Sequence, residues 1–477
     1  MAETINLDNE HPDFAATKAA RVKCRDLYGG SDVVKAKGST YLYTGNNETD
    51  DDFDIRLNRA VLDPWVEKIV IARQALLFSK QPARELPSKL AVYTNDVDRK
   101  GSSVGLFFQD AARDAQIDGI SWVAIDAPPT PEGGFTSRRE QERANHRPFF
   151  EHLPGSAVID WEIGDDGALL WAVVKQESTN NRGEEGWGTL DDAIEQWKVW
   201  TRSAWYLYER SEKSQKFDIV DEGINSSGVV PLVPFYGVRN GDFSGWPVCR
   251  AVSDHVLLIY NKDSDLDWFE RITSHPIPYI IGPMKPETLD TSKGLFVKSD
   301  AGDGTISVGY LEPSGQGFQS IRDSIMDLRY RILSIALAQA KKDSGQVQSG
   351  DGQREDRKIF AASVRTASQL YEAAELRCWS IMAKWIGESG KVKIEYNRDF
   401  DDRMIDAQML GAMTDLVSAA LIPQRVFLQS LVDGGALPAG FDIEAAIAEY
   451  EENQARLPEP LVVPAMADVG DEDEDEA

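Results

Sequence analysis

The segment that decides the fold spans residues 317–386: GFQSIRDSIMDLRYRILSIALAQAKK (317–342), DSGQVQSGDGQRE (343–355) and DRKIFAASVRTASQLYEAAELRCWSIMAKWI (356–386). Its outer two parts carry apolar residues at alternating intervals of four and three, the spacing of an amphipathic helix. The middle part has one apolar residue in thirteen. We therefore predict two long helices joined by a polar loop. The apolar stripes comprise Ile321, Ile325, Leu328, Ile332 and Ile335 in the first helix, and Phe360, Val364, Ala367, Tyr371, Ala374, Cys378, Ile381 and Trp385 in the second.

A third long helix is predicted just before this segment, over residues 247–272. Pro247 suits its first turn, where a missing N–H costs nothing. At 1.5 Å per residue, this helix and the helix over 317–342 are each about 40 Å long. Between them, residues 273–316 are rich in proline and glycine and hold three short strand-like runs. We expect an antiparallel helix pair with a small β-rich insertion at one tip.

The rest of the chain predicts an α+β protein. Pro64 is expected to break the helical pattern in which it lies. Helices are predicted over residues 12–28, 53–80, 102–118, 401–433 and 441–454, with a short helical insert at 190–197; strands are predicted over 120–126, within 148–240 and over 392–396; and a linker is predicted over 127–146. The chain ends in a run of six acidic residues, 471–476.

Composition fits a globular protein, since 42% of the 477 residues are hydrophobic and 27% are charged. The formal net charge of −28 disfavours non-specific binding to nucleic acid or to anionic membrane. No apolar run approaches the ~20 residues of a transmembrane helix. The acidic N-terminus lacks the apolar core of a signal peptide, so neither membrane insertion nor export is expected.

A search for catalytic chemistry finds no support. The three cysteines, Cys24, Cys249 and Cys378, are far apart and form no CxxC pair, so neither a metal site nor a redox motif is predicted. Phosphate-binding, dinucleotide-binding, nucleophile-elbow and zinc-protease motifs are all absent from the sequence. Alternate residues on a helix point to different faces, so the carboxylates at 263, 265, 267 and 270 are not expected to converge, and we interpret them as a solvated acidic face. No catalytic residue, metal or cofactor is predicted.

Taken in order, these elements resemble the portal proteins of tailed bacteriophages, from about residue 12 to residue 455. The segment DIRLNRA, residues 54–60, resembles an early helix of that family with an Arg-Leu-x-Arg-Ala pattern. Residues 119–126 followed by Pro128 resemble its helix-to-strand segment, and Arg147-Pro148 with Ile159 and Trp161 resemble its β block. Residues 231–237 precede the first long helix, as in the family.

The resemblance implies a portal fold and a ring of about twelve subunits at one capsid vertex. It divides the chain into a wing (1–245), a first stem helix (246–272), a clip (273–316), a second stem helix (317–342), a tunnel loop (343–355), a long wing helix with a strand (356–400), and a crown with the acidic tail (401–477). In this arrangement double-stranded DNA passes through the ring without sequence preference. The implied partners are terminase, a head-completion adaptor, and the major capsid and scaffolding proteins. The implied location is the virion, with assembly in the host cytoplasm.

Three groups of site residues follow from the same resemblance. Lys341, Lys342, Gln346, Gln348, Ser349 and Arg354 would face DNA in the channel. Ile321, Ile325, Leu328, Ile332, Ile335, Phe360, Val364 and Tyr371 would pack subunits together along the stem and wing helices. Tyr279, Ile281, Lys285, Phe296 and Tyr310 would form the clip surface on which terminase and the adaptor dock.

Two alternatives stay open for parts of this interpretation. The pair Lys341 and Lys342 can also be explained as cations that favour the dipole at a helix C-terminus. The whole chain can also be explained as an acidic cytoplasmic adaptor or enzyme without a recognisable motif, whose helices form an intramolecular bundle. A ring with a central hole separates the portal from that alternative.

Overall fold

The computed structural model describes residues 6–46, 48–128, 135, 137–179, 193–210, 216–273, 277–282, 295–298, 307–311, 316–337, 350–398, 400, 414–415, 417, 422–433, 437 and 441–455. The chain divides into two compact units, residues 1–400 and 401–477. The fold is α+β, as the sequence predicted.

Helices dominate the first unit and form all of the regular structure described in the second. The first unit contains α1 (Pro12–Tyr28), α2 (Ser31–Ala36), the 3₁₀ turn η1 (Gly38–Thr40), α3 (Asp50–Arg59), α4 (Trp65–Leu77), α5 (Ser88–Ala91), α6 (Val104–Asp118), α7 (Arg138–Arg143), α8 (Arg250–Thr273), α9 (Gln316–Leu337) and α10 (Gly350–Trp385). The second unit contains α12 (Gln424–Asp433) and α13 (Ile443–Ala455). The predicted break at Pro64 is confirmed, because Pro64 separates α3 from α4.

The largest sheet is a five-stranded antiparallel meander. Its strands, in spatial order, are β4 (Val158–Ile163), β5 (Leu169–Thr179), β6 (Ala193–Thr201), β7 (Ala204–Arg210) and β8 (Phe217–Ile224). The predicted helical insert at 190–197 is wrong, since residues 193–201 are strand β6. Pairing with β5 on one side and β7 on the other, with Trp197 and Trp200 both buried, overrides the local sequence preference.

Four smaller sheets complete the first unit. They are β3 (Phe149–Leu153), β2 (Ile120–Asp126) and β9 (Leu232–Tyr236) in the order β3-β2-β9; β10 (Val238–Gly241) with β11 (Ser244–Trp246); β1 (Ala83–Glu85) with β15 (Lys393–Glu395); and β13 (Leu295–Lys298), β12 (Ile277–Gly282) and β14 (Ser307–Leu311) in the order β13-β12-β14. The last of these lies between α8 and α9 in the chain, where the sequence predicted a β-rich insertion. Its β12–β13 pair is parallel and its β12–β14 pair antiparallel.

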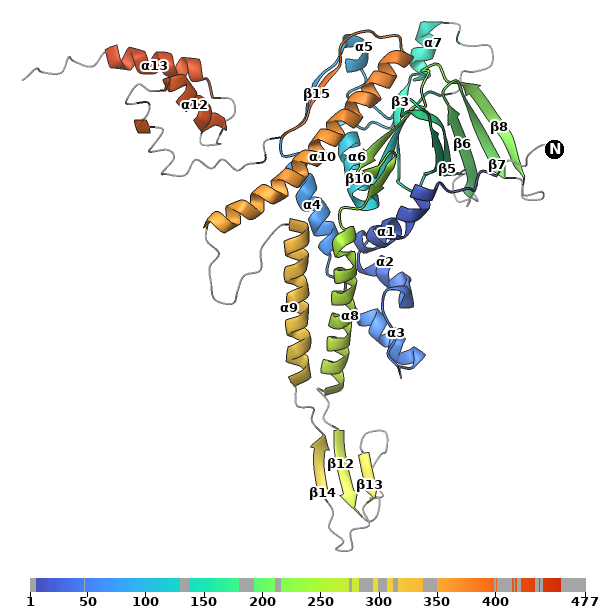
Figure 1. Ribbon diagram of the computed structural model, residues 1–477, viewed down its shortest axis with the longest axis vertical. Helices are drawn as coiled ribbons and strands as arrows, with labels where there is room; N and C mark the ends of the chain where they lie inside the picture. Colours follow the sequence, from blue (N-terminus) through green and yellow to red (C-terminus); the bar gives the residue numbers. More distant parts are fainter. Residues whose placement is uncertain are drawn as a thin grey trace, which may run out of the picture. The chain divides into compact units, whose positions relative to one another are not determined.

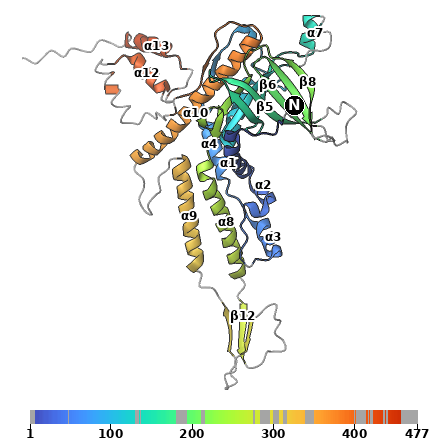
Figure 2. The ribbon, with the colours of Figure 1, turned by 45° about the vertical axis from the view of Figure 1, so that its right-hand side comes forward.

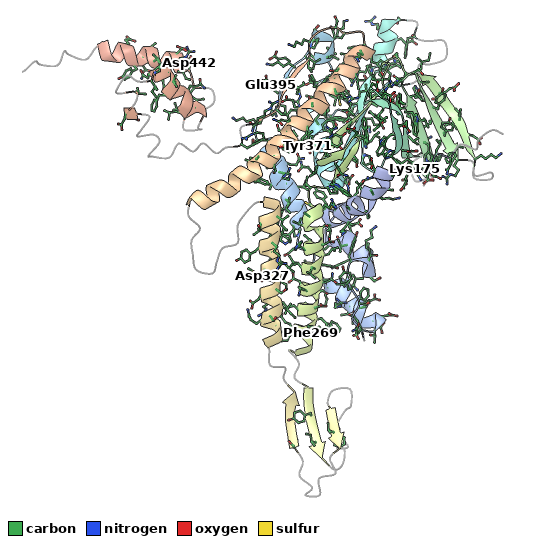
Figure 3. All side chains as sticks on the ribbon, viewed as in Figure 1. Lys175, Phe269, Asp327, Tyr371, Glu395 and Asp442 are labelled. Atoms are coloured by element: carbon green, nitrogen blue, oxygen red, sulfur yellow. The ribbon has the colours of Figure 1, made fainter. Side chains whose placement is uncertain are left out.

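Helix α10 packs its apolar stripe into the core against α6 and the β3-β2-β9 sheet. Aromatic rings connect the sheet to the helices on it. Between ring centroids, Phe235 lies 5.7 Å from Phe108 and 5.9 Å from Tyr371. Phe150 lies 5.0 Å from Trp379 in the same way. Figure 3 labels Tyr371 on α10 in this region. Cys378, a member of the predicted apolar stripe, is fully buried in the same cluster.

The junction between α6 and β2 fixes where α8 begins. Gly119 ends α6 with a left-handed φ of 90°, and its N–H donates to Ala115 O at 2.8 Å. A Cβ at this position would lie 2.6 Å from Gly245 O and 2.6 Å from Pro247 N. Only glycine permits this approach without strain, so the backbone that leads from β11 into α8 rests directly on the end of α6.

Candidate functional site: the paired helices and their neighbours

Helices α8 and α9 form the antiparallel pair that the sequence predicted, and Figure 1 and Figure 2 both show them side by side. They share an apolar cluster with α1 and α4. From α9 this cluster takes Ile325, Leu328 and Ile332, which are 3%, 6% and 0% exposed. From α8 it takes Val252, Val256, Leu257, Ile259 and Tyr260, and Cys249 joins it from just before the helix.

The carboxylates of α8 are 33–53% exposed, as their prediction as a solvated face implies, but each also pairs with an arginine that the sequence did not reveal. Toward α9, Asp263 lies 3.5 Å from the Arg329 guanidinium, and Glu270 pairs with Arg322. The two arginines are seven residues apart on α9, and the two acids are seven residues apart on α8. The ion pairs therefore recur every two turns of each helix. Because these partners are 52 or more residues apart in sequence, local spacing could not reveal them.

Two further acids of α8 pair with α3 on its other side. Asp265 lies 3.3 Å from Arg56, and Asp267 lies 2.7 Å from Arg59. Burial raises the pKa of Asp265 from its ordinary value. The hydrogen bond from Arg59 lowers the pKa of Asp267. Both arginines belong to the DIRLNRA segment, so the structure gives that motif a local role in holding α8.

The segment predicted as a polar loop, 343–355, overlaps helix α10 at its second half. Helix α10 begins at Gly350, so residues 350–355 belong to the helix. Arg354 therefore lies on a helix rather than in a loop. Lys341, Lys342, Gln346, Gln348 and Ser349 lie outside the described residues.

The prediction that the helix stripes pack subunits together needs correction. Ile325, Leu328, Ile332, Val364 and Tyr371 are all 6% exposed or less within one chain, so they have no surface left for a neighbouring subunit. Most of the apolar side chains of the two stripes are buried in the core of the same chain. Ile321 and Phe360 are half-buried, and Ile335 is 50% exposed, so these three remain accessible.

The predicted clip residues lie on the three-stranded sheet. Tyr279 and Ile281 belong to β12, Phe296 to β13 and Tyr310 to β14, while Lys285 lies outside the described residues. Val297 and Val308 are 43% and 68% exposed, so this small sheet also presents apolar side chains that the sequence prediction had not singled out.

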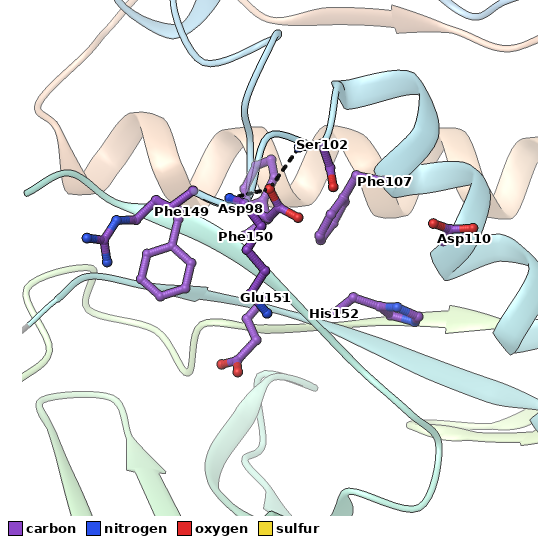
Figure 4. Close-up of a pocket in the computed structure, with 10 residues that line it drawn as sticks. Asp98, Ser102, Phe107, Asp110, Phe149, Phe150, Glu151 and His152 are labelled. Atoms are coloured by element: carbon purple, nitrogen blue, oxygen red, sulfur yellow. Dashed lines mark hydrogen bonds between the residues drawn. The ribbon is translucent and has the colours of Figure 1, made fainter. Parts of the chain in front are cut away.

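A cavity of about 650 Å³ lies between the loop at 96–102, α6 and β3 (Figure 4). Two of its acids, Asp98 and Asp110, already have partners. The Asp98 carboxylate accepts N–H groups of Lys100 at 2.9 Å and Ser102 at 3.1 Å, and Asp110 pairs with Arg113 at 2.7 Å. Burial lowers the pKa of His152, which favours its neutral form. The loop is joined to β3 by the Phe150 N–H, which donates to Val97 O at 2.8 Å.

Among the described residues, no group of three or more His, Cys, Asp or Glu side chains is placed to hold a metal ion. In the same part of the chain, no helix combines the length and apolar character needed to cross a membrane.

Residues 255–386 match the protein family described as Domain of unknown function (DUF4055). This match covers most of α8, all of α9 and α10, and the sheet between them. No curated protein sequence matches the chain.

Among solved structures, the chain is similar to one from the neck of an empty gene transfer agent (GTA) particle. The identity is 10% and the TM-score 0.42, over 82% of this chain and 94% of that one. It is also similar to a chain from the virion of the native particle, with 11% identity and a TM-score of 0.39, over 83% of this chain and 94% of that one. A chain from the neck of the native GTA particle gives 11% identity and a TM-score of 0.38.

Proposed function

We propose that this chain is a portal subunit, which forms a ring of about twelve copies around a channel for double-stranded DNA at a capsid vertex. The observation that carries the proposal is the order and pairing of α8, the β13-β12-β14 sheet, α9 and α10. Two long helices pair side by side, a small sheet is inserted between them, and a still longer helix follows. This arrangement suits a mechanical role.

The outer surface of the helix pair supports assembly into a ring. After the intramolecular core is complete, Leu258 and Phe269 on α8 are still 42% and 46% exposed, and Met326 and Ile335 on α9 are 44% and 50% exposed. Figure 3 labels Phe269 near the end of α8. Two neighbouring subunits in a ring would cover such side chains, because each subunit presents two different faces to its neighbours.

The charge of the chain fits a channel through which DNA slides. Twelve copies would carry roughly −336 in total, and strong phosphate contacts would slow the movement of DNA. In this proposal Lys341, Lys342 and Arg354 provide a weak grip without sequence preference. The amides of Gln346 and Gln348 and the Ser349 hydroxyl hydrogen-bond to the DNA backbone.

The three-stranded sheet would act as the clip, on which terminase docks during packaging and the head-completion adaptor docks afterwards. The exposed Val297 and Val308, together with Tyr279 and Phe296, supply an apolar surface of the kind that protein partners cover. In the same proposal, major capsid and scaffolding proteins contact the wing during assembly.

Replacing both Lys341 and Lys342 with glutamate tests the DNA-channel role. The change reverses two charges per subunit, so we expect particles with altered genome content or altered genome retention. The measurement is nuclease-protected DNA per particle, together with infectious or transducing titre. The matched control replaces Lys80 and Lys391, two exposed lysines outside α8, α9 and α10, with glutamate and should leave DNA content and titre unchanged. Unchanged DNA content and titre in the Lys341 and Lys342 variant would contradict the proposed channel role.

A further inference from the structure

Helix α3 is held to the protein mainly by charge. Arg56 is the one residue of α3 that is buried, at 4% exposed. Phe53 and Leu57 reach the apolar cluster only in part, and Ile55 is 40% exposed. A helix in a soluble protein is usually anchored by an apolar stripe, so the attachment of α3 needs another explanation.

Arg56 joins three segments of the chain. Its Nε and Nη2 donate to the two carboxylate oxygens of Glu48 at 2.6 and 2.7 Å, and Nη2 also donates to the carbonyl of Tyr43. On α8, Nη1 lies 3.3 Å from Asp265 Oδ1 and 3.5 Å from Ser264 Oγ. The fork on Glu48 is a bidentate pair, the strongest geometry for an arginine and a carboxylate.

A second fork lies one turn further along α3. Arg59 Nε donates to Asp267 Oδ2 at 2.7 Å, and Nη2 donates to Asp267 Oδ1 at 2.8 Å. Both side chains are about half exposed, at 49% and 47%. Salt screens an exposed pair of this kind, so this contact depends on ionic strength.

The ends of the same segment are anchored differently. Leu42 before it is fully buried, and Ala60 and Leu62 after it are each 4% exposed, all in the cluster that holds α8 and α9. Asn261 on α8 adds a polar anchor beside Leu42. Its Nδ2 donates to the Tyr41 carbonyl, and its Oδ1 accepts the Tyr43 N–H, each at 2.8 Å. A polar middle between two fixed ends can open locally without unfolding the core.

We propose that residues 48–59 form a latch on α8, which ion pairs hold closed and which opens as a unit while the core stays folded. Opening would uncover Ser264, which is 4% exposed, and would leave Asp265 and Asp267, already 53% and 47% exposed, without their arginines. The latch is thus a conformational device that controls access to the part of α8 that α3 covers. It does not require assembly into a ring.

Hydrogen exchange of the full-length protein tests the latch. Raising NaCl from about 0.1 M to 1 M shortens the screening length from about 10 Å to 3 Å. We expect amide exchange over residues 48–59 to become about three- to tenfold faster, after correction for the effect of salt on intrinsic exchange. Exchange over α4 and α6 should not change. Equal acceleration in all three helices, or none in α3, would overturn the proposal.

A charge swap identifies the pair responsible. Arg59→Asp should accelerate exchange over residues 48–59 by about threefold or more, because it places two acids opposite each other. Adding Asp267→Arg should restore slow exchange. Arg239→Asp, which breaks an exposed pair with Asp242 elsewhere, is the matched control and should leave residues 48–59 unchanged. If the swap exchanges as fast as Arg59→Asp alone, charge pairing does not hold the latch.

Discussion

At the scale of single residues, Glu375 shows how the long helix is tied to the strands beside it. This side chain is fully buried on α10, yet its two carboxylate oxygens accept four hydrogen bonds. Arg84 on β1 donates two, at 2.6 and 3.1 Å. The Tyr396 hydroxyl donates one at 2.7 Å, and Trp379 Nε1 donates one at 3.2 Å. A buried charge with this many donors is satisfied, so the group specifies one position for the β1–β15 ribbon on α10.

Removing the carboxylate should be costly. We expect Glu375→Ala to lower the free energy of unfolding by about 3–5 kcal/mol, because it leaves the Arg84 guanidinium buried without its partner. The measurement is chemical denaturation of the purified protein. Glu85→Ala is the matched control, since Glu85 pairs with Lys393 across the same two strands on the surface at 3.1 Å. The control should cost less than about 1 kcal/mol. Equal, small losses in both variants would contradict this account.

At the scale of elements, two junctions decide the arrangement: the turn at Gly119 that positions the start of α8, and the α9 face that meets α8. Periodicity in the sequence predicted α8, α9 and α10, and most of the predicted helix ends lie within a few residues of the observed ones. It also predicted the break at Pro64. It did not predict β6, because Trp197 and Trp200 lie in a strand through pairing on both sides, which local spacing does not record.

Gly119→Ala should destabilise the protein by about 2–4 kcal/mol, since it combines a left-handed backbone with a contact that the neighbouring backbone cannot relieve. Gly105→Ala on the same α6 helix is the control. Nothing lies within 4 Å of a Cβ there, and alanine favours a helix, so its stability should stay equal or rise slightly. Thermal or chemical denaturation measures both, and equal effects would contradict the proposed junction.

Substitutions at two neighbouring apolar positions on α9 distinguish an effect on folding from an effect on assembly. Ile332 is fully buried, whereas Ile335 is 50% exposed. Ile332→Asp should prevent stable folding, because it buries an unpaired charge. Ile335→Asp should change the free energy of unfolding by less than about 0.5 kcal/mol but should weaken assembly into rings. Denaturation and light scattering measure the two effects. An Ile335→Asp protein that assembles as well as the unchanged chain would remove this residue from the subunit contact.

At the scale of the whole molecule, the sequence predicted the order of the parts better than their contacts. The apolar stripes were expected to pack neighbouring subunits, but one chain already buries most of them, because α9 meets α8, and α10 meets α6 and the β3-β2-β9 sheet. The ion pairs of α8 were missed for a related reason. Asp265 and Asp267 find their arginines more than 200 residues earlier in the chain, and no local pattern connects such partners.

The central claim is a ring built from this chain, and mass measurement with imaging tests it most directly. The purified chain of 53.0 kDa should be followed by light scattering over a range of concentrations and by negative-stain electron microscopy. The account predicts a particle of about 640 kDa for about twelve subunits, with a central hole in the images. A 53.0 kDa monomer at every concentration, or a small closed oligomer without a hole, would contradict it.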